Sequence, residues 1–340
     1  MTTMDWTKKT VLVVGTGISG VAATELLLKN GSRVILFDGN QELDVAALKE
    51  KNPQLTEVEI ILGTLKEEDL KRIDLAVLSP GVPTDLPMVE QIREKEIPIW
   101  GEIELAYQFT KGAVVAITGT NGKTTTTALT GEIMANYFPD VKVVGNIGIP
   151  YTSVAADTTD ETVTVAEISS FQLETIHEFH PKVTAILNIT PDHLNRHHTM
   201  ECYIKTKESI TRNQTRDEVC VLNYEDEELR KFGETLHCTP LYFSSVRKLE
   251  NGLFYEDGAI YYARDGQNEK VIDVDELNIL GLHNYENAMA ATGMALTMGV
   301  SLDKIRESLK KFQAVEHRIE YVTEWNGIRF YNDSKGTNPD

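Results

Sequence analysis

The sequence predicts an α/β protein with more than one mainly parallel sheet, and three observations support this class. Two apolar runs rich in β-branched residues, at positions 11–15 and 114–118, each lead into a glycine-rich turn and then a helical stretch. Later apolar runs alternate with helical stretches, which is the pattern of a parallel sheet built from βαβ units. With 340 residues, the chain is long enough for two or three domains with substantial cores.

The first domain, residues 1–100, is predicted to be Rossmann-like. The strand at 11–15 is followed by Gly15-Thr16-Gly17-Ile18-Ser19-Gly20 and a helix at 21–29, and a second strand at 33–38 ends in Asp38. Such a motif brings a pyrophosphate close to the backbone at a helix N-terminus and places a carboxylate near a sugar. A UDP-sugar satisfies this pattern as well as NAD does.

A loop after the third predicted strand is a further candidate ligand site. The strand at 75–78 leads into residues 79–83, SPGVP, which include Gly81. This loop lies at the carboxyl end of the sheet, where ligands bind in open α/β folds. An ordinary Pro-Gly turn explains the segment equally well.

The central domain, residues 101–314, is predicted to be a P-loop-type ATPase domain with a mainly parallel sheet, and a connecting helix marks its start. Strands are expected at 114–118, 162–168, 183–189 and 218–223, antiparallel hairpins at 251–273, and helices at 284–298 and 303–312. Residues 315–340 are expected to begin a C-terminal α/β domain that is cut off, because an apolar strand followed by turn formers normally leads into a helix.

The segment after the strand at 114–118 predicts a nucleoside triphosphate site. It reads Gly119-Thr120-Asn121-Gly122-Lys123-Thr124-Thr125. Backbone N–H groups at the helix N-terminus would face the phosphates, Lys123 supplies positive charge to the β- and γ-oxygens, and the Thr124 hydroxyl is a magnesium ligand. The spacing is shorter than in the general P-loop, since Gly119 lies only three positions before Gly122. A glycine- and threonine-rich turn with an incidental lysine is the alternative.

Three further segments carry candidate catalytic groups. Glu167 ends an apolar strand, where a carboxylate is placed to hold magnesium, and His193 follows the strand at 183–189 with Asp192 beside it. Histidine more often binds zinc or iron than magnesium. Lys205 and Lys207 share a helix, and from composition alone both are expected to be solvated surface charges. His197 and His198 are expected to be surface residues at a helix start.

Composition narrows the possible partners and location. The chain has 33 basic and 52 acidic residues and a net charge of -19, which disfavours nucleic acid and acidic membrane surfaces. Its three cysteines form no Cys-x-x-Cys pair and suit a reducing compartment. No apolar run approaches the roughly 18 residues that a membrane helix needs. We therefore expect a cytoplasmic protein that binds anionic ligands through helix N-termini, lysines and metal ions rather than through its overall charge.

The shortened phosphate loop resembles that of the Mur ligases and folylpolyglutamate synthetases. The resemblance to the Mur ligases extends over the whole chain. The segments that point to the member adding D-glutamate are residues 166–174 (AEISSFQLE), 191–197 (PDHLNRH) and 333–338 (DSKGTN). Gly336 stands where the family often has alanine, and Asn195 where aspartate occurs.

The resemblance implies roles for specific residues. It implies two magnesium ions held by Thr124, Glu167 and His193, and a carbamylated lysine near them, matched by Lys207 with Lys205 as the second choice. Lys123, Glu167, His193, Lys207 and Lys335 are the implied catalytic residues. The implied ATP contacts are residues 119–125 with Asn284, Asn287, Arg318 and Asp333. The implied contacts of the uridine nucleotide substrate are Gly15, Gly17, Ile18, Ser19, Asp38, Gly81, Asn146 and His193.

The activity implied by the resemblance is ATP-driven amide synthesis in cell-wall precursor assembly. The carboxylate of UDP-N-acetylmuramoyl-L-alanine would attack the γ-phosphate of ATP, and the amine of D-glutamate would displace phosphate from the acyl phosphate. A monomer is expected, and this chain is expected to bind the UDP-sugar but to be a poor ligase. The alternatives are another Mur ligase or folylpolyglutamate synthetase-like ligase, an NAD-dependent oxidoreductase, which leaves the second loop idle, and a non-catalytic nucleotide-binding protein.

Overall fold

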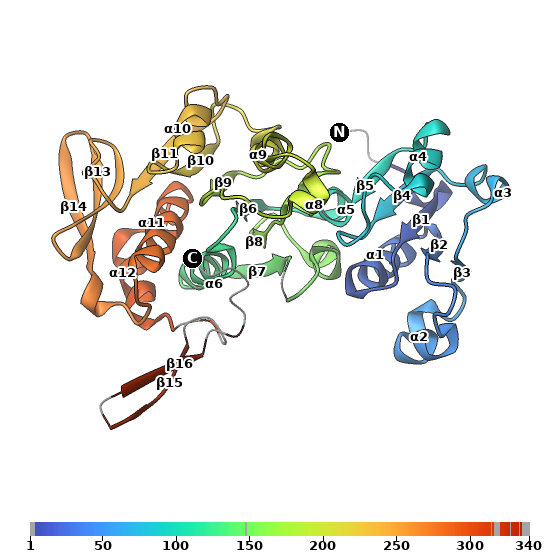
Figure 1. The fold of residues 1–340 in the computed structure, drawn as a ribbon, viewed down its shortest axis with the longest axis horizontal. Coiled ribbons are helices and arrows are strands. Elements are labelled where there is room, and N and C mark those ends of the chain that lie inside the picture. The colour runs from blue at the N-terminus through green and yellow to red at the C-terminus, as the bar shows by residue number, and fades with distance from the viewer. Residues whose placement is uncertain are drawn as a thin grey trace. The chain divides into compact units, whose positions relative to one another are not determined.

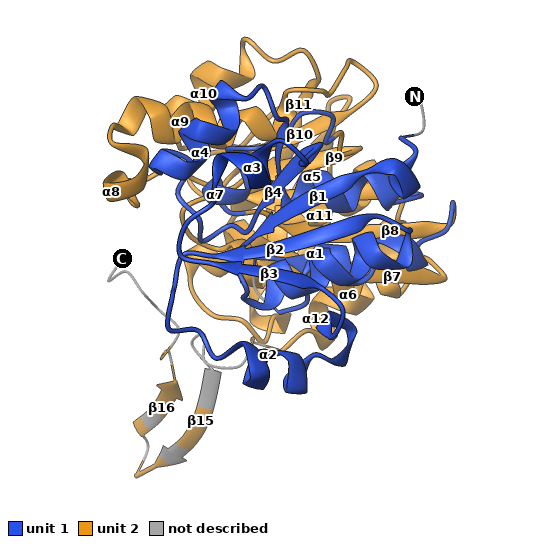
Figure 2. Ribbon diagram, turned by 90° about the vertical axis from the view of Figure 1, so that its right-hand side faces the viewer, with its two compact units in different colours: residues 1–112, 144–160, 169–179 blue, residues 113–143, 161–168, 180–340 orange. Residues whose placement is uncertain are grey.

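The computed structural model describes residues 4–146, 148–313, 315, 320–326, 328–332 and 334. Its contacts divide the chain into two compact units, coloured separately in Figure 2. Unit 1 comprises Met1–Gly112, Val144–Asp160 and Ser169–Phe179, and unit 2 comprises Ala113–Val143, Glu161–Ile168 and His180–Asp340. The units are therefore discontinuous in sequence. The domain limits inferred from the sequence stay a proposal.

Unit 1 contains a five-stranded parallel sheet in the order β3-β2-β1-β4-β5 (Figure 1). The strands are β1 (Thr10–Val14), β2 (Arg33–Asp38), β3 (Glu59–Leu62), β4 (Leu75–Leu78) and β5 (Ile99–Gly101). Strand β1 pairs with β2 on one side and with β4 on the other. The connection after β1 is thus at the point where the strand order changes direction, the usual ligand position in open parallel sheets.

The helices of unit 1 are α1 (Ile18–Lys29), α2 (Val45–Lys51), α3 (Glu67–Leu70), α4 (Pro87–Glu94), α5 (Glu102–Phe109) and α7 (Ser170–Leu173). Short 3-10 turns lie at Trp6–Lys8, Pro53–Leu55, Tyr151–Ser153 and Ala155–Asp157. The core on this sheet combines apolar side chains of β1, β2 and β4 with those of α3, α4 and their connections, and all of them are almost fully buried. Burying this apolar surface is the main favourable term for folding the unit.

The second sheet has nine strands in the order β14-β13-β12-β11-β10-β9-β6-β8-β7. Its strands are β6 (Ala113–Thr118), β7 (Asp140–Gly145), β8 (Thr162–Glu167), β9 (Val183–Ile186), β10 (Val219–Asn223), β11 (Thr239–Ser244), β12 (Gly252–Glu256), β13 (Ala259–Arg264) and β14 (Gln267–Asp273). Pairing is parallel from β8 through β6, β9, β10 and β11 to β12, and antiparallel from β12 to β14. The predicted α/β class with mainly parallel sheets is confirmed.

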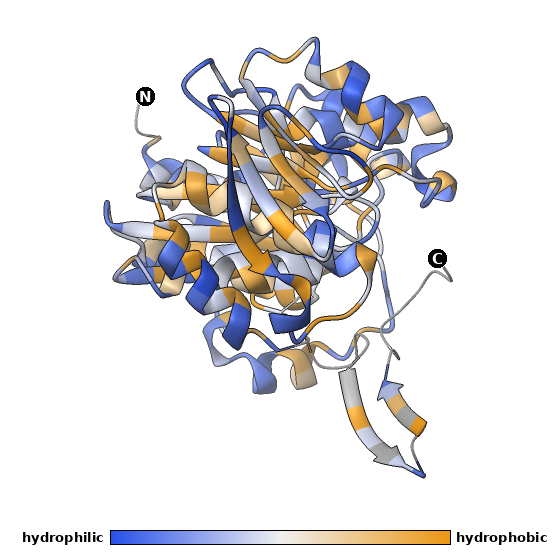
Figure 3. Cartoon of the chain, turned by 90° about the vertical axis from the view of Figure 1, so that its left-hand side faces the viewer, coloured by the Kyte–Doolittle hydropathy of each residue, from blue (hydrophilic) through white to orange (hydrophobic). Residues whose placement is uncertain are grey.

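The helices of unit 2 are α6 (Lys123–Ala135), α8 (Leu194–His197), α9 (Met200–Glu208), α10 (Glu227–Gly233), α11 (Leu282–Thr297) and α12 (Leu302–Lys311), with 3-10 turns at Ser209–Thr211 and Val274–Glu276. Helices α6, α11 and α12 bury apolar residues against β6, β8 and β9 in one cluster. Helix α12 buries Ile305 and Leu309 among charged neighbours, and Figure 3 shows this mixture of hydrophobic and hydrophilic residues along the helices.

Two features complete the fold. Strands β15 (Glu320–Trp325) and β16 (Ile328–Asn332) form an antiparallel hairpin. Across the described residues, no helix combines the length and the apolar character needed to span a bilayer.

Candidate functional site

The predicted site residues form two groups, one in each unit. The group in unit 1 consists of Gly15, Gly17, Ile18, Ser19, Asp38, Gly81 and Asn146. The group in unit 2 consists of residues 119–125, Glu167, His193, Lys207, Asn284 and Asn287. Arg318, Asp333 and Lys335 lie outside the described residues. We call residues 15–20 the first glycine loop and residues 119–125 the phosphate loop.

Two glycines of the first glycine loop are required by close approaches within the protein. Gly15 has φ +99°, and a Cβ there would lie 2.8 Å from the Ser79 hydroxyl oxygen. A Cβ on Gly20 would lie 1.9 Å from the carbonyl oxygen of Gly15. These contacts fix the tight turn from β1 into α1 and bring it against the residue that follows β4.

Other glycines at this edge of the sheet face open space. A Cβ on Gly17 or Gly81 would meet no atom within 4 Å. Gly17 precedes the first turn of α1, which carries no acidic residue, and Gly17 supplies no side-chain cap. The Ile18 side chain beside it is 76% exposed. The N–H groups of a first helical turn have no partner within the helix, so this arrangement can accept an anion such as a pyrophosphate.

Asp38 joins the end of β2 to the first glycine loop. Its carboxylate accepts hydrogen bonds from the Thr16 hydroxyl at 2.6 Å, from the Thr16 backbone N–H at 3.1 Å and from the Asn40 backbone N–H at 2.9 Å. Partial burial opposes ionisation, but these bonds outweigh it and hold the pKa of Asp38 below its usual range. The carboxylate is therefore ionised and oriented next to the anion-accepting turn.

Asn146 lies in an exposed segment after β7 that belongs to unit 1. A short distance along the chain, Thr152 donates to the buried Glu102 carboxylate through its backbone N–H at 2.7 Å and its hydroxyl at 2.8 Å. Burial raises the pKa of Glu102, although hydrogen bonds from Thr152, Tyr151 and Gln172 oppose this. Glu102, whose role was not predicted from the sequence, anchors Thr152 to α5.

The phosphate loop runs from the end of β6 into α6, as predicted. Gly119 has φ +154°, and a Cβ there would lie 3.0 Å from the Cβ of Leu187. Gly122 has φ +83°, and a Cβ there would lie 2.4 Å from Oδ1 of Asn287. The same Oδ1 atom accepts from the Thr126 hydroxyl at 3.1 Å, so α11 is tied to the first turns of α6. These glycines let the backbone turn tightly beneath a position suited to phosphate.

Asn284 and Asn287 lie together on α11, and both are buried. The side-chain amide of Asn287 donates to Oδ1 of Asn284 at 3.1 Å, and Asn284 donates to the Leu280 carbonyl at 2.7 Å. Through the contact with Thr126, this pair lies beside the phosphate loop, as its predicted nucleotide role requires.

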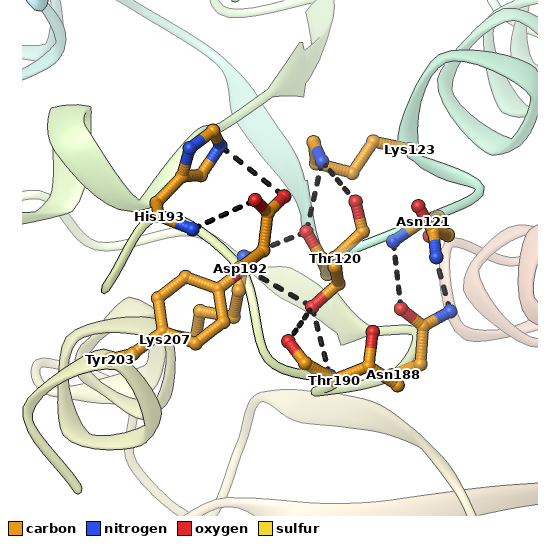
Figure 4. Close-up of polar contacts among 10 residues, drawn as sticks. Thr120, Asn121, Lys123, Asn188, Thr190, Asp192, His193, Tyr203 and Lys207 are labelled. Carbon is orange, nitrogen blue, oxygen red and sulfur yellow. Dashed lines mark hydrogen bonds and ion pairs between the residues drawn. The ribbon is translucent and has the colours of Figure 1, made fainter. Parts of the chain in front are cut away.

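Two lysines converge on the phosphate loop (Figure 4). The ammonium group of Lys123 donates to the carbonyl oxygens of Gly119 at 2.9 Å and Thr120 at 2.8 Å. Lys207, on α9, donates to the same Gly119 oxygen at 2.7 Å. Lys207 is 1% exposed, so the surface position expected from composition alone is wrong. Burial, and then the charge of Lys123, hold the pKa of Lys207 well below its usual range. Lys205 is exposed and paired with Glu201.

Thr120 is the centre of a hydroxyl network that joins three segments. Its hydroxyl oxygen accepts from the Thr190 N–H at 3.0 Å and lies 3.1 Å from both the Thr190 carbonyl and the Tyr203 hydroxyl. Burial raises the pKa of Tyr203 to about 12. Tyr203 is therefore a neutral hydroxyl one turn before Lys207 on α9. Its role was not predicted from the sequence.

Glu167 ends β8 and His193 follows β9, the two strands that flank β6. Glu167 is 3% exposed and pairs across the sheet with Ile117, just before the phosphate loop. His193 has φ +52° and is the N-cap residue just before α8, and its ring lies 3.5 Å from the carboxylate of Asp192. The carboxylate also accepts the His193 backbone N–H at 2.8 Å. Asp192 thus orients the imidazole, as expected. His197 was expected at the surface but is 2% exposed, and its ring packs on Tyr203.

Two of the three candidate protein ligands, Thr124 and Glu167, suit magnesium. Thr124 and Glu167 offer oxygen atoms, which Mg²⁺ prefers, whereas a lysine amine offers Mg²⁺ no ligand. Within the part of the chain that the structure describes, no three His, Cys, Asp or Glu side chains form a ready metal site. Mg²⁺ is typically held by one or two carboxylates together with substrate phosphates and water, so the residues present fit that ion.

Comparisons with known proteins agree with this geometry. The Mur ligase MurD-like N-terminal domain matches residues 9–101, and the Mur ligase middle domain matches residues 117–295. The UDP-N-acetylmuramoylalanine--D-glutamate ligase of Lachnoclostridium phytofermentans is 56% identical over 337 residues, covering 99% of this chain and 74% of that protein. The ligase of the same name from Lachnospira eligens is 55% identical over 338 residues, covering 99% and 75%.

A solved structure shares the fold at lower identity. The UDP-N-acetylmuramate-alanine ligase MurC from Thermotoga maritima is 23% identical with a TM-score of 0.56, and the match covers 96% of this chain and 74% of that one. This structure shows a shared fold, and the two domain matches with the two relatives above 50% identity show the family. The chain belongs to the Mur ligase family, in its MurD-like branch.

Proposed function

We propose that this chain is an ATP-dependent ligase that joins D-glutamate to UDP-N-acetylmuramoyl-L-alanine in peptidoglycan precursor synthesis. The observation that carries the proposal is that Lys123 and Lys207 meet at one carbonyl oxygen of the phosphate loop, with the buried Glu167 at the end of the strand beside β6. The 56% identity to a ligase of this name supports the choice of substrates. The cytoplasm as its location and a monomeric state are further predictions.

The nucleotide-sugar is proposed to bind at the first glycine loop of unit 1. The open space at Gly17 and Gly81 leaves room for a pyrophosphate at the N-terminus of α1. Asp38 is ionised and fixed next to this turn, where it can accept hydrogen bonds from the uridine. Asn146, in the exposed segment after β7, is the proposed contact for the rest of this substrate, together with His193 of unit 2.

ATP is proposed to bind at the phosphate loop of unit 2. The N–H groups of residues 122–125 at the start of α6 are the proposed phosphate donors, and Lys123 would exchange its carbonyl contacts for the phosphate oxygens. Thr124, Glu167 and His193 are the proposed protein ligands of two magnesium ions. When bound, these ions would neutralise phosphate charge and so let a carboxylate approach.

Lys207 is proposed to be carbamylated. The unprotonated amine would attack carbon dioxide through nitrogen and lose a proton, leaving a carbamate anion. Burial and the neighbouring Lys123 charge both favour the unprotonated amine that this reaction needs. The change would place an anion beside the cation of Lys123. A carbamate also offers the oxygen donors that an amine lacks.

The proposed reaction has two steps. A carboxylate oxygen of the L-alanyl group attacks the γ-phosphorus. The bond between the γ-phosphorus and the ADP oxygen breaks, and an acyl phosphate forms. The amine nitrogen of D-glutamate then attacks the acyl carbon, phosphate leaves and the nitrogen loses a proton. In the first step the ammonium of Lys123 can stabilise the charge that develops on the transferred phosphoryl oxygens. Arg318, Asp333 and Lys335 are proposed to contact ATP and the reacting carboxylate.

The direct test is phosphate release with ATP, magnesium, the UDP-sugar and D-glutamate, omitting each in turn. The assay uses protein of the same length as the relatives, because these 340 residues span 74% of the ligase from Lachnoclostridium phytofermentans. Glu167→Ala and Lys207→Ala are expected to abolish turnover while UDP-sugar binding is retained. If the wild-type chain binds the nucleotides but releases no phosphate, and both variants bind them equally well, the chain is a non-catalytic nucleotide-binding protein. NAD reduction by the chain would instead favour an oxidoreductase.

A further inference from the structure

Asn188 lies where β9 and β6 stop pairing as strands. The last backbone contacts are Leu187 N–H to the Thr118 carbonyl at 3.0 Å and Thr120 N–H to the Asn188 carbonyl at 3.0 Å. Beyond this point the Asn188 side chain replaces the missing strand. Its Oδ1 accepts the Asn121 N–H at 2.8 Å, and its amide donates to the Asn121 carbonyl at 3.2 Å (Figure 4). The Asn188 side chain therefore binds both backbone polar groups of Asn121, its N–H and its carbonyl oxygen.

This contact determines which backbone donors of the phosphate loop are directed at a ligand. The N–H groups of Thr120 and Asn121 both point to Asn188. The next donors belong to residues 122–125, at the start of α6, where N–H groups have no intrahelical partner. Gly122, with φ +83°, is the residue at which the backbone turns away from Asn188 and into the first turn of α6. Fixing Asn121 therefore fixes the direction of the N–H groups that follow.

Asn188 is itself held firmly from the other side. The next residue, Ile189, donates its N–H to Oδ2 of Asp226 at 2.7 Å, and Asp226 also accepts two N–H groups at the start of α10. Thr190 donates its N–H to the Thr120 hydroxyl at 3.0 Å. Residues 188–190 thus form a rigid support that connects α10 to the phosphate loop and leads directly into the segment carrying His193.

We propose that Asn188 is a positioning residue for ATP, which acts by orienting the Asn121 peptide so that the N–H groups of residues 122–125 meet the β- and γ-phosphates. This inference rests on the proposed function, in that it takes ATP as the ligand of the phosphate loop. Asn188 touches no reacting group in this account, and its effect is transmitted through the loop.

The neighbouring strand provides a matched control. Asn223 ends β10 and is 6% exposed, and its Oδ1 accepts the N–H of Glu225 within its own turn at 2.9 Å. The side chain of Asn188 instead reaches Asn121, 67 positions away. Replacing Asn223 by alanine removes a strand-end amide of the same kind without touching the phosphate loop.

The test measures dissociation constants of ATP, AMP and UDP-N-acetylmuramoyl-L-alanine by calorimetry, with magnesium, for the wild-type chain, Asn188→Ala and Asn223→Ala. For Asn188→Ala we expect ATP affinity to fall about 25-fold, the effect of losing two hydrogen bonds of ordinary strength. AMP, which lacks the β- and γ-phosphates, and the UDP-sugar should bind within about twofold of wild type. Asn223→Ala should leave all three affinities unchanged.

Three outcomes would overturn the inference. ATP affinity of Asn188→Ala within twofold of wild type would contradict it, and so would an equal fall for ATP, AMP and the UDP-sugar, which indicates general destabilisation. If the wild-type chain binds no ATP, the proposed function fails and the inference fails with it. Should Asn188→Ala not fold, Asn188→Asp keeps the acceptor for the Asn121 N–H but removes the donor to its carbonyl, and the same selective loss of ATP affinity is expected.

Discussion

Lys207 and Lys123 donate hydrogen bonds to one carbonyl oxygen, that of Gly119, at 2.7 and 2.9 Å. Two buried or half-buried ammonium groups on one acceptor repel each other, and the burial of Lys207 makes this repulsion costly. The charge of Asp192 opposes this effect but is the smaller influence, so the pKa of Lys207 stays well below its usual range. Such an arrangement favours chemistry that removes the charge of Lys207 or reverses it.

Carbamylation of Lys207 can be observed directly. We expect one additional carbon signal in the NMR spectrum of the chain equilibrated with carbon-13 bicarbonate. Lys207→Ala should remove this signal. Lys205→Ala is the matched control, because Lys205 lies two residues away, is exposed and is paired with Glu201 at 2.7 Å. Loss of the signal in Lys205→Ala rather than Lys207→Ala would show that the wrong lysine was chosen, and no signal in the wild-type chain would contradict carbamylation.

Two glycines of the first glycine loop should respond differently to alanine. Gly17→Ala places a methyl group in open space, so the melting temperature should stay within a few degrees of wild type, but the UDP-sugar should bind at least about tenfold more weakly. Gly20→Ala places a Cβ 1.9 Å from a backbone oxygen and should destabilise the fold itself. Thermal unfolding and calorimetry distinguish the two. Unchanged UDP-sugar affinity in Gly17→Ala would place the ligand elsewhere.

Asp38 should give a small stabilisation that depends on pH. Its pKa is lowered in the folded chain relative to the ordinary value of 3.8, so its contribution is present above 3.8 and is lost as the pH falls through the lower, folded value. Asp38→Asn should reduce the free energy of unfolding by less than about 1 kcal/mol near neutral pH, because the group is partly exposed. Urea unfolding at several pH values measures this. A difference that grows on acidification would contradict the assignment.

The Tyr203 hydroxyl should matter for the nucleotide but not for the sugar substrate. Tyr203→Phe keeps the ring packed on His197 and removes the contact with the Thr120 hydroxyl at 3.1 Å. One ordinary hydrogen bond corresponds to about a fivefold loss of ATP affinity. UDP-sugar affinity measured on the same protein is the internal control. Equal ATP affinities for wild type and Tyr203→Phe would show that this network does not support the phosphate loop.

Local sequence patterns predicted the elements that carry the two glycine loops. Strands β1 and β6 are continuous apolar runs bounded by glycine, which is a strong local signal. Strands β3, β5, β7 and β11 were not predicted. They are short, or they carry charged residues or proline, as in β7 (DVKVVG) and β11 (TPLYFS), so their pairing is decided by the neighbouring strands. Strand β9 ends at Ile186, three residues before the expected limit.

The contacts that organise the sites could not be predicted in the same way. Asn188 and Asn121 are 67 residues apart, and Thr120 and Tyr203 are 83 residues apart. Glu102 and Thr152, which hold part of the later chain in unit 1, are 50 residues apart. No pattern within a short stretch of sequence indicates that residues so far apart along the chain will be in contact. The burial of Lys207 likewise depends on how α9 packs. Composition alone predicts that a lysine on a helix is exposed to solvent.

Calorimetric titration of the chain with UDP-N-acetylmuramoyl-L-alanine and, separately, with NAD distinguishes the ligase from an oxidoreductase. We expect saturable binding of the UDP-sugar, weakened by Gly17→Ala, and no binding of NAD. Binding of NAD without binding of the UDP-sugar would contradict the ligase assignment and would mean that the first glycine loop serves an oxidoreductase.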